Sequence, residues 1–161
     1  MEEYPNQAPE IEPPDGMYPS RMDDRGRIKL PVAFKEYLEK FENKRLFVTS
    51  LDRRIAQIYP MAIWRDNEKV FESFRDNPRV AKSVAFNAAD LGAETEMDGQ
   101  GRILLSPELR RELGIENAPV RLFAYRGHIE IMSEKIYEAR KLQAAELTEE
   151  DFSKLEAAGL N

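Results

Sequence analysis

The chain has 161 residues, of which 42% are hydrophobic and 34% are charged, with a formal net charge of −6 and no cysteine. This composition is typical of a soluble globular protein with one domain or two small ones, and it excludes disulfides and thiolate metal sites. No apolar run approaches the roughly 20 residues of a membrane span, and the acidic, proline-rich start is unlike a signal peptide. We therefore expect a cytoplasmic protein without a membrane partner.

Charge is unevenly distributed along the chain. Residues 1–20 contain five acidic and no basic side chains, residues 140–161 contain five acidic and three basic ones, and residues 21–139 are left with a net charge of +1. A balanced central part can still present a basic face. Residues 1–15 hold four prolines and little to bury, which predicts a disordered acidic tail. The tail is either a solvated extension or an acidic arm that competes with DNA for the basic face.

Regular structure is expected from Gly16 onward, beginning with a strand, a turn and a second strand that ends at Leu30. Asp23 to Gly26 form the turn, because aspartate bonds nearby backbone N–H groups and glycine supplies a positive φ. Pro31 is suited to the first position of a helix, whose apolar residues fall at helical spacing. The next elements are expected to be strands at 45–50 and 55–59 and helices at 62–74 and 79–90.

The second half of the chain repeats this order. Residues 98–101 form the equivalent turn, after which Ser106 caps a helix that starts at Pro107 and ends at Gly114. The spacing of a capping box at residues 148–151 predicts one more short helix. The strands of this half are expected at 94–97, 102–105, 120–125 and 130–132.

One short phrase occurs twice and indicates an internal duplication. The sequence MDDRGRI at residues 22–28 returns as MDGQGRI at residues 97–103, 75 residues later, and Lys35 and Arg110 match at the same offset. One such half is too small to bury a comfortable core alone. The sequence therefore predicts an α+β protein made of two β-β-α-β-β units that interlock around one core.

In each copy of the phrase an arginine, Arg27 or Arg102, directly follows the turn. Its planar guanidinium can bind two acceptors at once, as on guanine or phosphate. The aspartate four residues earlier, Asp23 or Asp98, can hold that fork ready for binding or form an internal salt bridge that fixes the loop, and these two roles are compatible. The glycines that let the backbone come close to a groove or phosphate are Gly26 and Gly101. Further candidates for contact with DNA are Arg25, Lys29 and Gln100 beside the turns and, with solvated charge as the alternative, Arg53, Arg54, Arg110 and Arg111.

Catalytic chemistry has little support in this sequence. Trp64 and Tyr137 close the two units at equivalent places and are expected in the core, and the sole histidine, His128, is expected on a strand surface. One histidine without cysteine gives no basis for a histidine or cysteine metal site or a hydrolytic triad, and no phosphate loop or dinucleotide fingerprint is found. We expect neither an enzyme nor a cofactor nor a small-molecule substrate.

These motifs resemble those of the MraZ family of bacterial transcriptional regulators, whose chains contain two SpoVT-AbrB-type units. The resemblance covers about residues 16–140 and rests on the doubled phrase together with GMY at 16–18, IYP at 58–60 and GAETEM at 92–97. It implies units interlocked as a pseudo-two-fold swapped-hairpin (double-psi/AbrB-like) barrel with flanking helices. It also implies ring-like homo-oligomers that bind double-stranded DNA at short repeated promoter boxes. In that family the Asp-x-x-x-Arg motif of each unit contacts the DNA, which here means Asp23 with Arg27 and Asp98 with Arg102.

The resemblance further implies a repressor of its own division and cell-wall gene cluster, located in the cytoplasm and at the nucleoid. The alternative is an AbrB-fold interaction module, antitoxin-like or a scaffold, that no longer binds DNA. The acidic total charge and a helix at 79–90 that is less basic than usual for the family favour this alternative. The implied organisation is a tail at 1–15, a first SpoVT-AbrB-like repeat at 16–61, a helical inter-repeat segment at 62–91, a second repeat at 92–135 and a C-terminal helical tail at 136–161.

Overall fold

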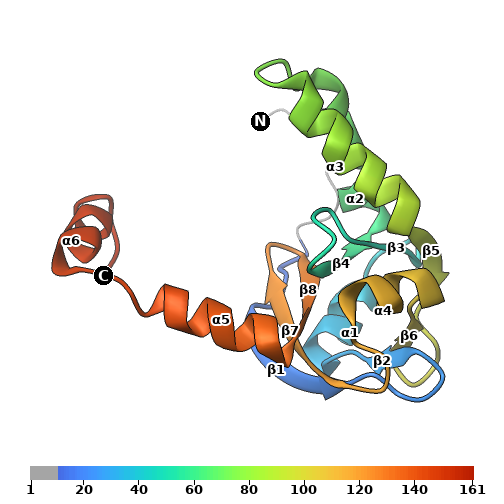
Figure 1. Cartoon of the computed structure of the whole chain (residues 1–161). Coiled ribbons are helices and arrows are strands. Elements are labelled where there is room, and N and C mark those ends of the chain that lie inside the picture. Colours follow the sequence, from blue (N-terminus) through green and yellow to red (C-terminus); the bar gives the residue numbers. More distant parts are fainter. Residues whose placement is uncertain (1–10) are drawn as a thin grey trace.

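The structure of the protein, a computed structural model, describes residues 11–161 (Figure 1). Residues 1–10, which make up most of the predicted disordered tail, lie outside the described residues. Residues 11–15 form no helix or strand, yet Ile11 packs, partly buried, against the main core. This contact ties the segment before the first strand to the body of the protein.

Residues 11–161 form eight strands and six helices, which confirms the predicted α+β class. The strands are β1 Gly16–Arg21, β2 Arg27–Lys29, β3 Arg45–Thr49, β4 Ala56–Pro60, β5 Ala93–Glu96, β6 Arg102–Leu104, β7 Pro119–Tyr125 and β8 His128–Ser133. The helices are α1 Val32–Glu39, α2 Met61–Ser73, α3 Pro78–Leu91, α4 Pro107–Leu113, α5 Glu134–Ala144 and α6 Glu149–Ala157.

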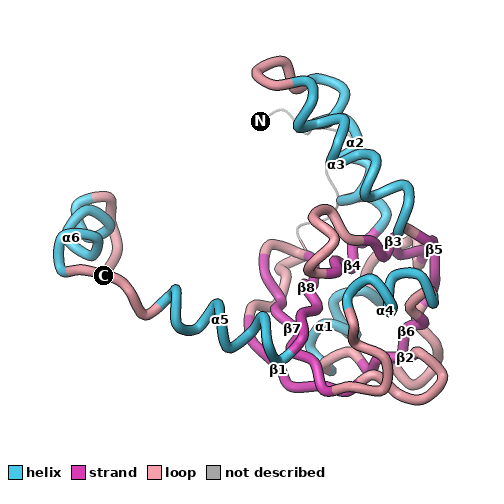
Figure 2. The backbone as a smooth tube through the Cα atoms, viewed as in Figure 1, coloured by secondary structure: helices cyan, strands magenta, loops and turns pink. Residues whose placement is uncertain are grey.

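Six strands form one antiparallel sheet in the order β1-β7-β8-β4-β3-β5, and β2 pairs with β6 in a separate two-stranded ribbon (Figure 2). Strands of the first half pair with strands of the second throughout: β1 with β7, β3 with β5, β4 with β8 and β2 with β6. Because buried backbone groups need hydrogen-bond partners, each half depends on the other to complete its strands.

The helix ends largely follow the predicted signals. The side chain of Ser106 accepts a backbone hydrogen bond at the start of α4, and Gly114 ends that helix with a φ of 65°. Thr148 and Asp151 form both hydrogen bonds of the capping box that opens α6. Pro31 differs from the prediction, because it is the residue before α1 and not the first residue of the helix.

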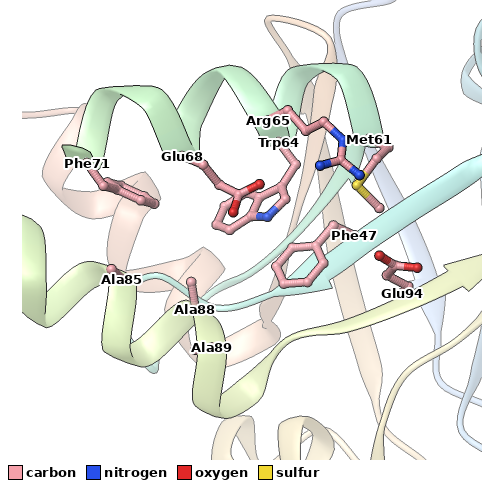
Figure 3. A pocket seen from close by; sticks show the side chains of 10 residues that line it. All are labelled: Phe47, Met61, Trp64, Arg65, Glu68, Phe71, Ala85, Ala88, Ala89 and Glu94. Carbon is pink, nitrogen blue, oxygen red and sulfur yellow. The ribbon is translucent and has the colours of Figure 1, made fainter. Parts of the chain in front are cut away.

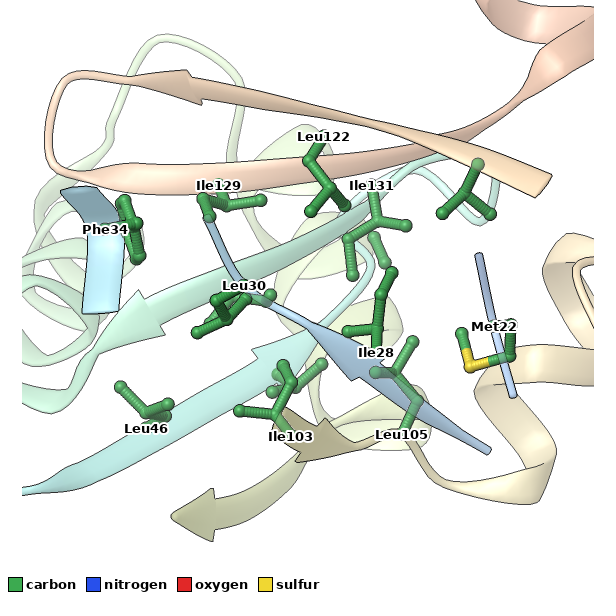
Figure 4. Packing of buried hydrophobic residues seen from close by; sticks show 14 of the residues in the cluster. Met22, Ile28, Leu30, Phe34, Leu46, Ile103, Leu105, Leu122, Ile129 and Ile131 are labelled. Atoms are coloured by element: carbon green, nitrogen blue, oxygen red, sulfur yellow. The ribbon is translucent and has the colours of Figure 1, made fainter. Parts of the chain in front are cut away.

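The main core lies between the ribbon and the large sheet and draws on both halves (Figure 4). Its largest fully buried side chains are Met22, Ile28, Phe34, Ile58, Ile103, Leu105, Leu109, Ile115, Leu122, Ile129 and Ile131. Burying one such side chain stabilises the fold by about 1.5–3 kcal/mol. Because β2 and β6 contribute Ile28 and Ile103 to this layer, one face of the ribbon is anchored and the other is turned outward.

A second, smaller core lies where α2 and α3 meet the sheet. Trp64 is buried there, with its ring stacked on Phe47 at a centroid distance of 4.4 Å. The expectation that Trp64 belongs to the core is correct. Tyr137 was expected at an equivalent place, but it is only half-buried on α5, with the guanidinium of Arg121 4.3 Å from its ring centroid. The physical reason is that α3 covers α2, whereas no helix in the described part of the chain covers α5 in the same way.

Two helical parts project from the body in different directions (Figures 1 and 2). The α2–α3 hairpin extends from one end of the sheet, and α5 carries α6 away from the other side. Every residue from Lys141 to Asn161 is exposed. None of the described helices has both the length and the apolar character that crossing a membrane requires.

Candidate nucleic-acid interface

The two Asp-x-x-Gly-Arg loops have the same backbone geometry. In the first loop the N–H of Asp23 donates to the carbonyl of Arg27 at 2.9 Å, and the φ of Gly26 is 80°. In the second loop the N–H of Asp98 donates to the carbonyl of Arg102 at 2.8 Å, and the φ of Gly101 is 78°. The duplicated sequence is therefore matched by a duplicated loop structure.

Each aspartate binds both the turn and its arginine. One oxygen of Asp23 accepts the backbone N–H groups of Arg25 and Arg27 at 2.9 and 2.8 Å, and the other accepts Nε of Arg27 at 2.9 Å. Asp98 makes the same three hydrogen bonds, with Gln100 and Arg102. One carboxylate in each loop thus both fixes the turn and holds the arginine side chain.

These hydrogen bonds also set the charge of the two aspartates. The backbone N–H of Arg27 is the main cause that lowers the pKa of Asp23, against a smaller opposing effect of desolvation. The backbone N–H of Arg102 lowers the pKa of Asp98 in the same way. Both carboxylates are therefore ionised at neutral pH and hold their arginines by charge-assisted hydrogen bonds.

The motif arginines keep part of their binding capacity free. The side chains of Arg27 and Arg102 are each 27% exposed and use Nε for the aspartate. Within residues 11–161 neither of their Nη atoms has a hydrogen-bond partner. Since a guanidinium has five donors in a fixed fork, each arginine can still donate to two acceptors of a ligand.

The ribbon brings the two arginines to one surface. The Cα partners across it are Arg27 with Leu104, Ile28 with Ile103 and Lys29 with Arg102. Side chains alternate between the faces of a strand, so both isoleucines face the core and the other four side chains face outward. Arg27 and Arg102 are diagonal neighbours on that outer face, about 7–8 Å apart by usual sheet geometry.

The ribbon is close to two-fold symmetric. Ile28 and Ile103 are equivalent residues of the duplication, and they pair with each other. On either side of them the N–H of Leu30 donates to the carbonyl of Gly101 at 2.8 Å, and the N–H of Leu105 donates to that of Gly26 at 2.9 Å. These two bonds are themselves equivalents at the offset of 75 residues. The ribbon thus joins the two loops through a symmetric set of backbone contacts.

The remaining candidates beside the loops make the two copies unequal. Arg25, Lys29 and Gln100 are all exposed. The second copy has Gln100 at the place of Arg25, and at the place of Lys29 it has Leu104, which is 54% exposed. The first copy therefore has two positive charges, and one negative charge at Asp24, that the second lacks.

Each loop rests on the helix of the other unit. Arg110 of α4 lies against Gly26, where an added Cβ would be 1.1 Å from its Nη1 atom, and Lys35 of α1 lies against Gly101, where the nearest atom would be 3.1 Å away. Arg110 is only 15% exposed and donates to the carbonyls of Arg25 and Leu105. This supporting role differs from the phosphate contact considered for Arg110. In the sequence, the match of Lys35 with Arg110 at the repeat offset is the feature that could have indicated this supporting role.

Arg53 is likewise a structural residue. Its Nε, Nη1 and Nη2 donate to Glu112, Asn87 and Asp90 at 2.7, 2.9 and 2.6 Å, so each nitrogen of the guanidinium already binds another part of the protein. The bonds to Asp90 and Glu112 raise the pKa of Arg53 above its ordinary value. Arg54 and Arg111 are exposed. Phosphate binding by Arg53 is therefore disfavoured. Arg53 also lies outside the β2–β6 ribbon.

No part of the described chain shows a metal-binding cluster. Among residues 11–161 no group of three or more histidine, cysteine, aspartate or glutamate side chains could hold a metal ion. His128 stacks on Tyr59 with a centroid distance of 5.0 Å, and burial lowers its pKa. A neutral, stacked imidazole at this place is a packing residue at the start of β8.

The fold and these loops define a duplicated α+β protein whose two units present equivalent arginine loops on one ribbon. The chain belongs to the MraZ family, as its sequence motifs indicated. The family model described as "MraZ protein, putative antitoxin-like" matches residues 91–161.

Three relatives are each named "Transcriptional regulator MraZ". The one from Acidobacterium capsulatum is 30% identical over 145 residues, which cover 90% of this chain and 98% of the relative. The one from Koribacter versatilis is 32% identical over 148 residues, with the same coverage of 90% and 98%. The one from Thermomicrobium roseum is 33% identical over 135 residues, covering 81% and 89%. The family is one of transcriptional regulators and not of enzymes, in agreement with the sequence prediction.

Proposed function

We propose that this protein is a sequence-specific DNA-binding transcriptional regulator and that the outer face of the β2–β6 ribbon, with its two loops, is the DNA-contacting surface. The relatives' name supports the class of function. The observation that carries the assignment to the ribbon is that two arginines, each held by its own aspartate, have free Nη atoms on one outward face. The major groove of B-DNA is wide enough to admit a two-stranded β-ribbon.

Each residue of the surface has a distinct proposed role. Arg27 and Arg102 donate their free Nη atoms to guanine edges or phosphates, while their aspartates keep the guanidinium planes in place. Arg25 and Lys29 contact phosphates, and Gln100 contacts a base edge or a phosphate. The first copy of the loop then depends more on phosphate contact than the second, which has no extra positive charge.

We also infer that the two units form the swapped-hairpin, AbrB-like barrel that the family resemblance implies. The pairing of every strand with a strand of the other half supports this description. So does the exchange of supports, in which α4 carries the first loop and α1 carries the second. In this arrangement each DNA-contacting loop is held by both units.

The biological role follows from the family resemblance. The protein represses its own division and cell-wall gene cluster by binding short repeated boxes upstream of it, in the cytoplasm at the nucleoid. It acts as a homo-oligomer, arranged as a ring, in which several weak sites read several boxes. Linked sites gain affinity through effective concentration, which offsets the modest positive charge of one ribbon.

A gel-shift assay with DNA from upstream of the protein's own gene tests the ribbon directly. Arg27→Ala combined with Arg102→Ala should abolish the specific shift, while mass and melting temperature stay close to those of the wild type. Arg75→Ala combined with Arg126→Ala, in the loops between α2 and α3 and between β7 and β8, is the matched control, because it removes two exposed arginines elsewhere and should leave the shift intact. Normal binding by the double variant would refute the assignment.

A second candidate, an interaction module that no longer binds DNA, is favoured by the words "putative antitoxin-like" in the description of the family model. It predicts that wild-type protein gives no shift with the upstream DNA and instead retains one protein partner in stoichiometric amount. A specific shift by the wild type decides against this candidate.

A further inference from the structure

The C-terminal helix α6 is closed at both ends although all of its residues are exposed. At its start Thr148 and Asp151 exchange the two bonds of the capping box, at 2.9 and 3.1 Å. At its end Gly159 has a φ of 122°, and the N–H of Leu160 donates back to the carbonyl of Leu155 at 2.9 Å, which is the Schellman arrangement. A helix of nine residues is marginal in water by itself, so these caps define an element that the rest of the described chain does not support.

One face of α6 is apolar and has one acidic edge. Phe152 and Leu155 are 45% and 52% exposed. At 100° per residue, Glu149 and Glu156 lie together along one edge of this face, whereas Glu150 lies on the opposite side of the helix. The helix has four acidic residues and one lysine. A preformed apolar face of this kind with a consistent charge is typical of an interaction site.

A surface of opposite charge lies on α3. A groove of about 390 Å³ is lined by Arg79, Lys82, Ser83, Phe86 and Asn87. These residues fall at the i, i+3, i+4, i+7 and i+8 positions of one helix face. Phe86 is 66% exposed. The groove therefore combines an unpacked aromatic ring with two positive charges and has no acidic lining residue.

The other hollow beside α3 is less suited to an acidic helix. It lies between α2, α3 and β3, has a volume of about 330 Å³ and is lined by aromatic side chains such as Trp64 and Phe71 (Figure 3). Glu68 and Glu94 line it together with a single arginine, Arg65. Its net negative lining would repel the acids along the edge of the apolar face of α6.

We propose that α6 docks through Phe152 and Leu155 into the α3 groove of a second copy of this chain. The inference rests on the homo-oligomer of the proposed function and names the contact that forms it. Within one chain the two surfaces stand apart, because α6 lies beyond the outer end of α5 while α3 belongs to the α2–α3 hairpin (Figure 1). The contact is heterologous, so its repetition from copy to copy generates a closed ring or an open filament.

Charge reversal with exchange tests this contact in the full-length protein. Glu149→Lys with Glu156→Lys on α6, or Arg79→Glu with Lys82→Glu on α3, each places like charges together and should raise the dissociation constant of the oligomer at least about tenfold by sedimentation. The matched control for the α6 pair is Glu146→Lys with Glu150→Lys, which changes the net charge by the same amount but lies off the apolar face. It should assemble as the wild type does.

An equimolar mixture of the two reversed proteins then separates docking between chains from docking within one. In the mixture every α6 meets a groove of opposite charge on the other protein, so assembly should return to nearly wild-type strength. A single chain that carries all four reversals is the complementary test. If this chain sediments as the wild type does while the mixture does not, α6 docks within one chain and the proposal is overturned. A wild-type oligomer that neither reversal weakens would overturn the α6–α3 contact alone, whereas a monomeric wild type would overturn the homo-oligomer as well.

Discussion

The two motif glycines offer a matched pair of substitutions, because they share a backbone conformation and differ in their neighbours. Their φ values are 80° for Gly26 and 78° for Gly101. Alanine in this left-handed region costs about 1–2 kcal/mol at either position. At Gly101 the new Cβ would lie 3.1 Å from Cδ of Lys35, a contact that a flexible side chain relieves by a small shift. Gly101→Ala should therefore lower the free energy of unfolding by about 1–2 kcal/mol.

Gly26→Ala should cost more, because its Cβ would lie 1.1 Å from Nη1 of Arg110 and force the guanidinium out of its place. That movement breaks the hydrogen bonds from Arg110 to the carbonyls of Arg25 and Leu105, at 3.4 and 3.3 Å. Each is worth about 0.5–1.5 kcal/mol. Part of this loss is returned, since Nε of Arg110 is buried without a hydrogen-bond partner among the described residues, with Oε1 of Glu116 at 3.7 Å, and gains water when it moves. We expect a total of about 2–4 kcal/mol.

Urea unfolding at neutral pH measures the loss of unfolding free energy in both variants. The comparison holds when the slope of that free energy against urea concentration is the same in each variant. The decisive comparison repeats Gly26→Ala in a background of Arg110→Ala, where the obstructing side chain is absent. There the cost of Gly26→Ala should fall to that of Gly101→Ala, which gives a coupling of about 1 kcal/mol or more in the mutant cycle. Equal costs at the two glycines, or a cost at Gly26 that Arg110→Ala does not change, would refute the view that Arg110 supports the first loop.

Three further predictions concern the loops and the core. Arg102→Lys keeps the charge but loses the fork, so affinity for the promoter box should fall about 10–100-fold while affinity for scrambled DNA stays near that of the wild type in titrations; equal losses on both would contradict base reading. Asp23→Asn with Asp98→Asn should lower the melting temperature at neutral pH, and this deficit should narrow as the pH falls below 3.8, because carboxylates with a lowered pKa stabilise the fold above that value and lose this effect as they protonate. A deficit that is constant down to low pH would count against this role. Burial raises the pKa of Tyr37 to about 12, and its hydroxyl donates to the carbonyl of Gly127 at 3.2 Å. Tyr37→Phe should therefore cost about 1 kcal/mol in neutral urea unfolding and should reduce the loss of stability between pH 10 and about 12 that ionisation of the unfolded phenol causes in the wild type.

Local elements of this fold could be predicted because their signals lie within a few residues. Ser106 and Gly114 mark the two ends of α4, and the capping box places the start of α6 at Glu149. The partners of the strands could not be derived in this way. β1 pairs with β7 across about 100 residues of chain, and no local pattern specifies that register. Tyr137 was misplaced for a related reason, since its burial depends on whether another helix covers α5.

The arrangement of the candidate site could be predicted only in part. The duplication pointed to Arg27 and Arg102, but it left open whether they face each other, the solvent or the core. That answer depends on the pairing of β2 with β6, which places both on one outer face. The role of Arg110 depends on the same exchange between units, because its helix supports a loop 84 positions earlier in the chain. Arg53 resembled a free cation in sequence and is instead bound by three side chains that come from α3 and α4.

The pairing of Ile28 with Ile103 places a local dyad at the centre of the ribbon. Duplex DNA has dyads of its own, so a single subunit can meet an imperfect palindrome in the way that two-fold dimers meet theirs. The match is incomplete, because Arg25 and Lys29 on one side correspond to Gln100 and Leu104 on the other. Because the two copies differ at these positions, the two ends of the ribbon surface are not equivalent. Under the proposed DNA-binding role, a subunit that reads from its Arg25 and Lys29 side to its Gln100 and Leu104 side would recognise the orientation of an asymmetric sequence, which an undiverged ribbon would not do.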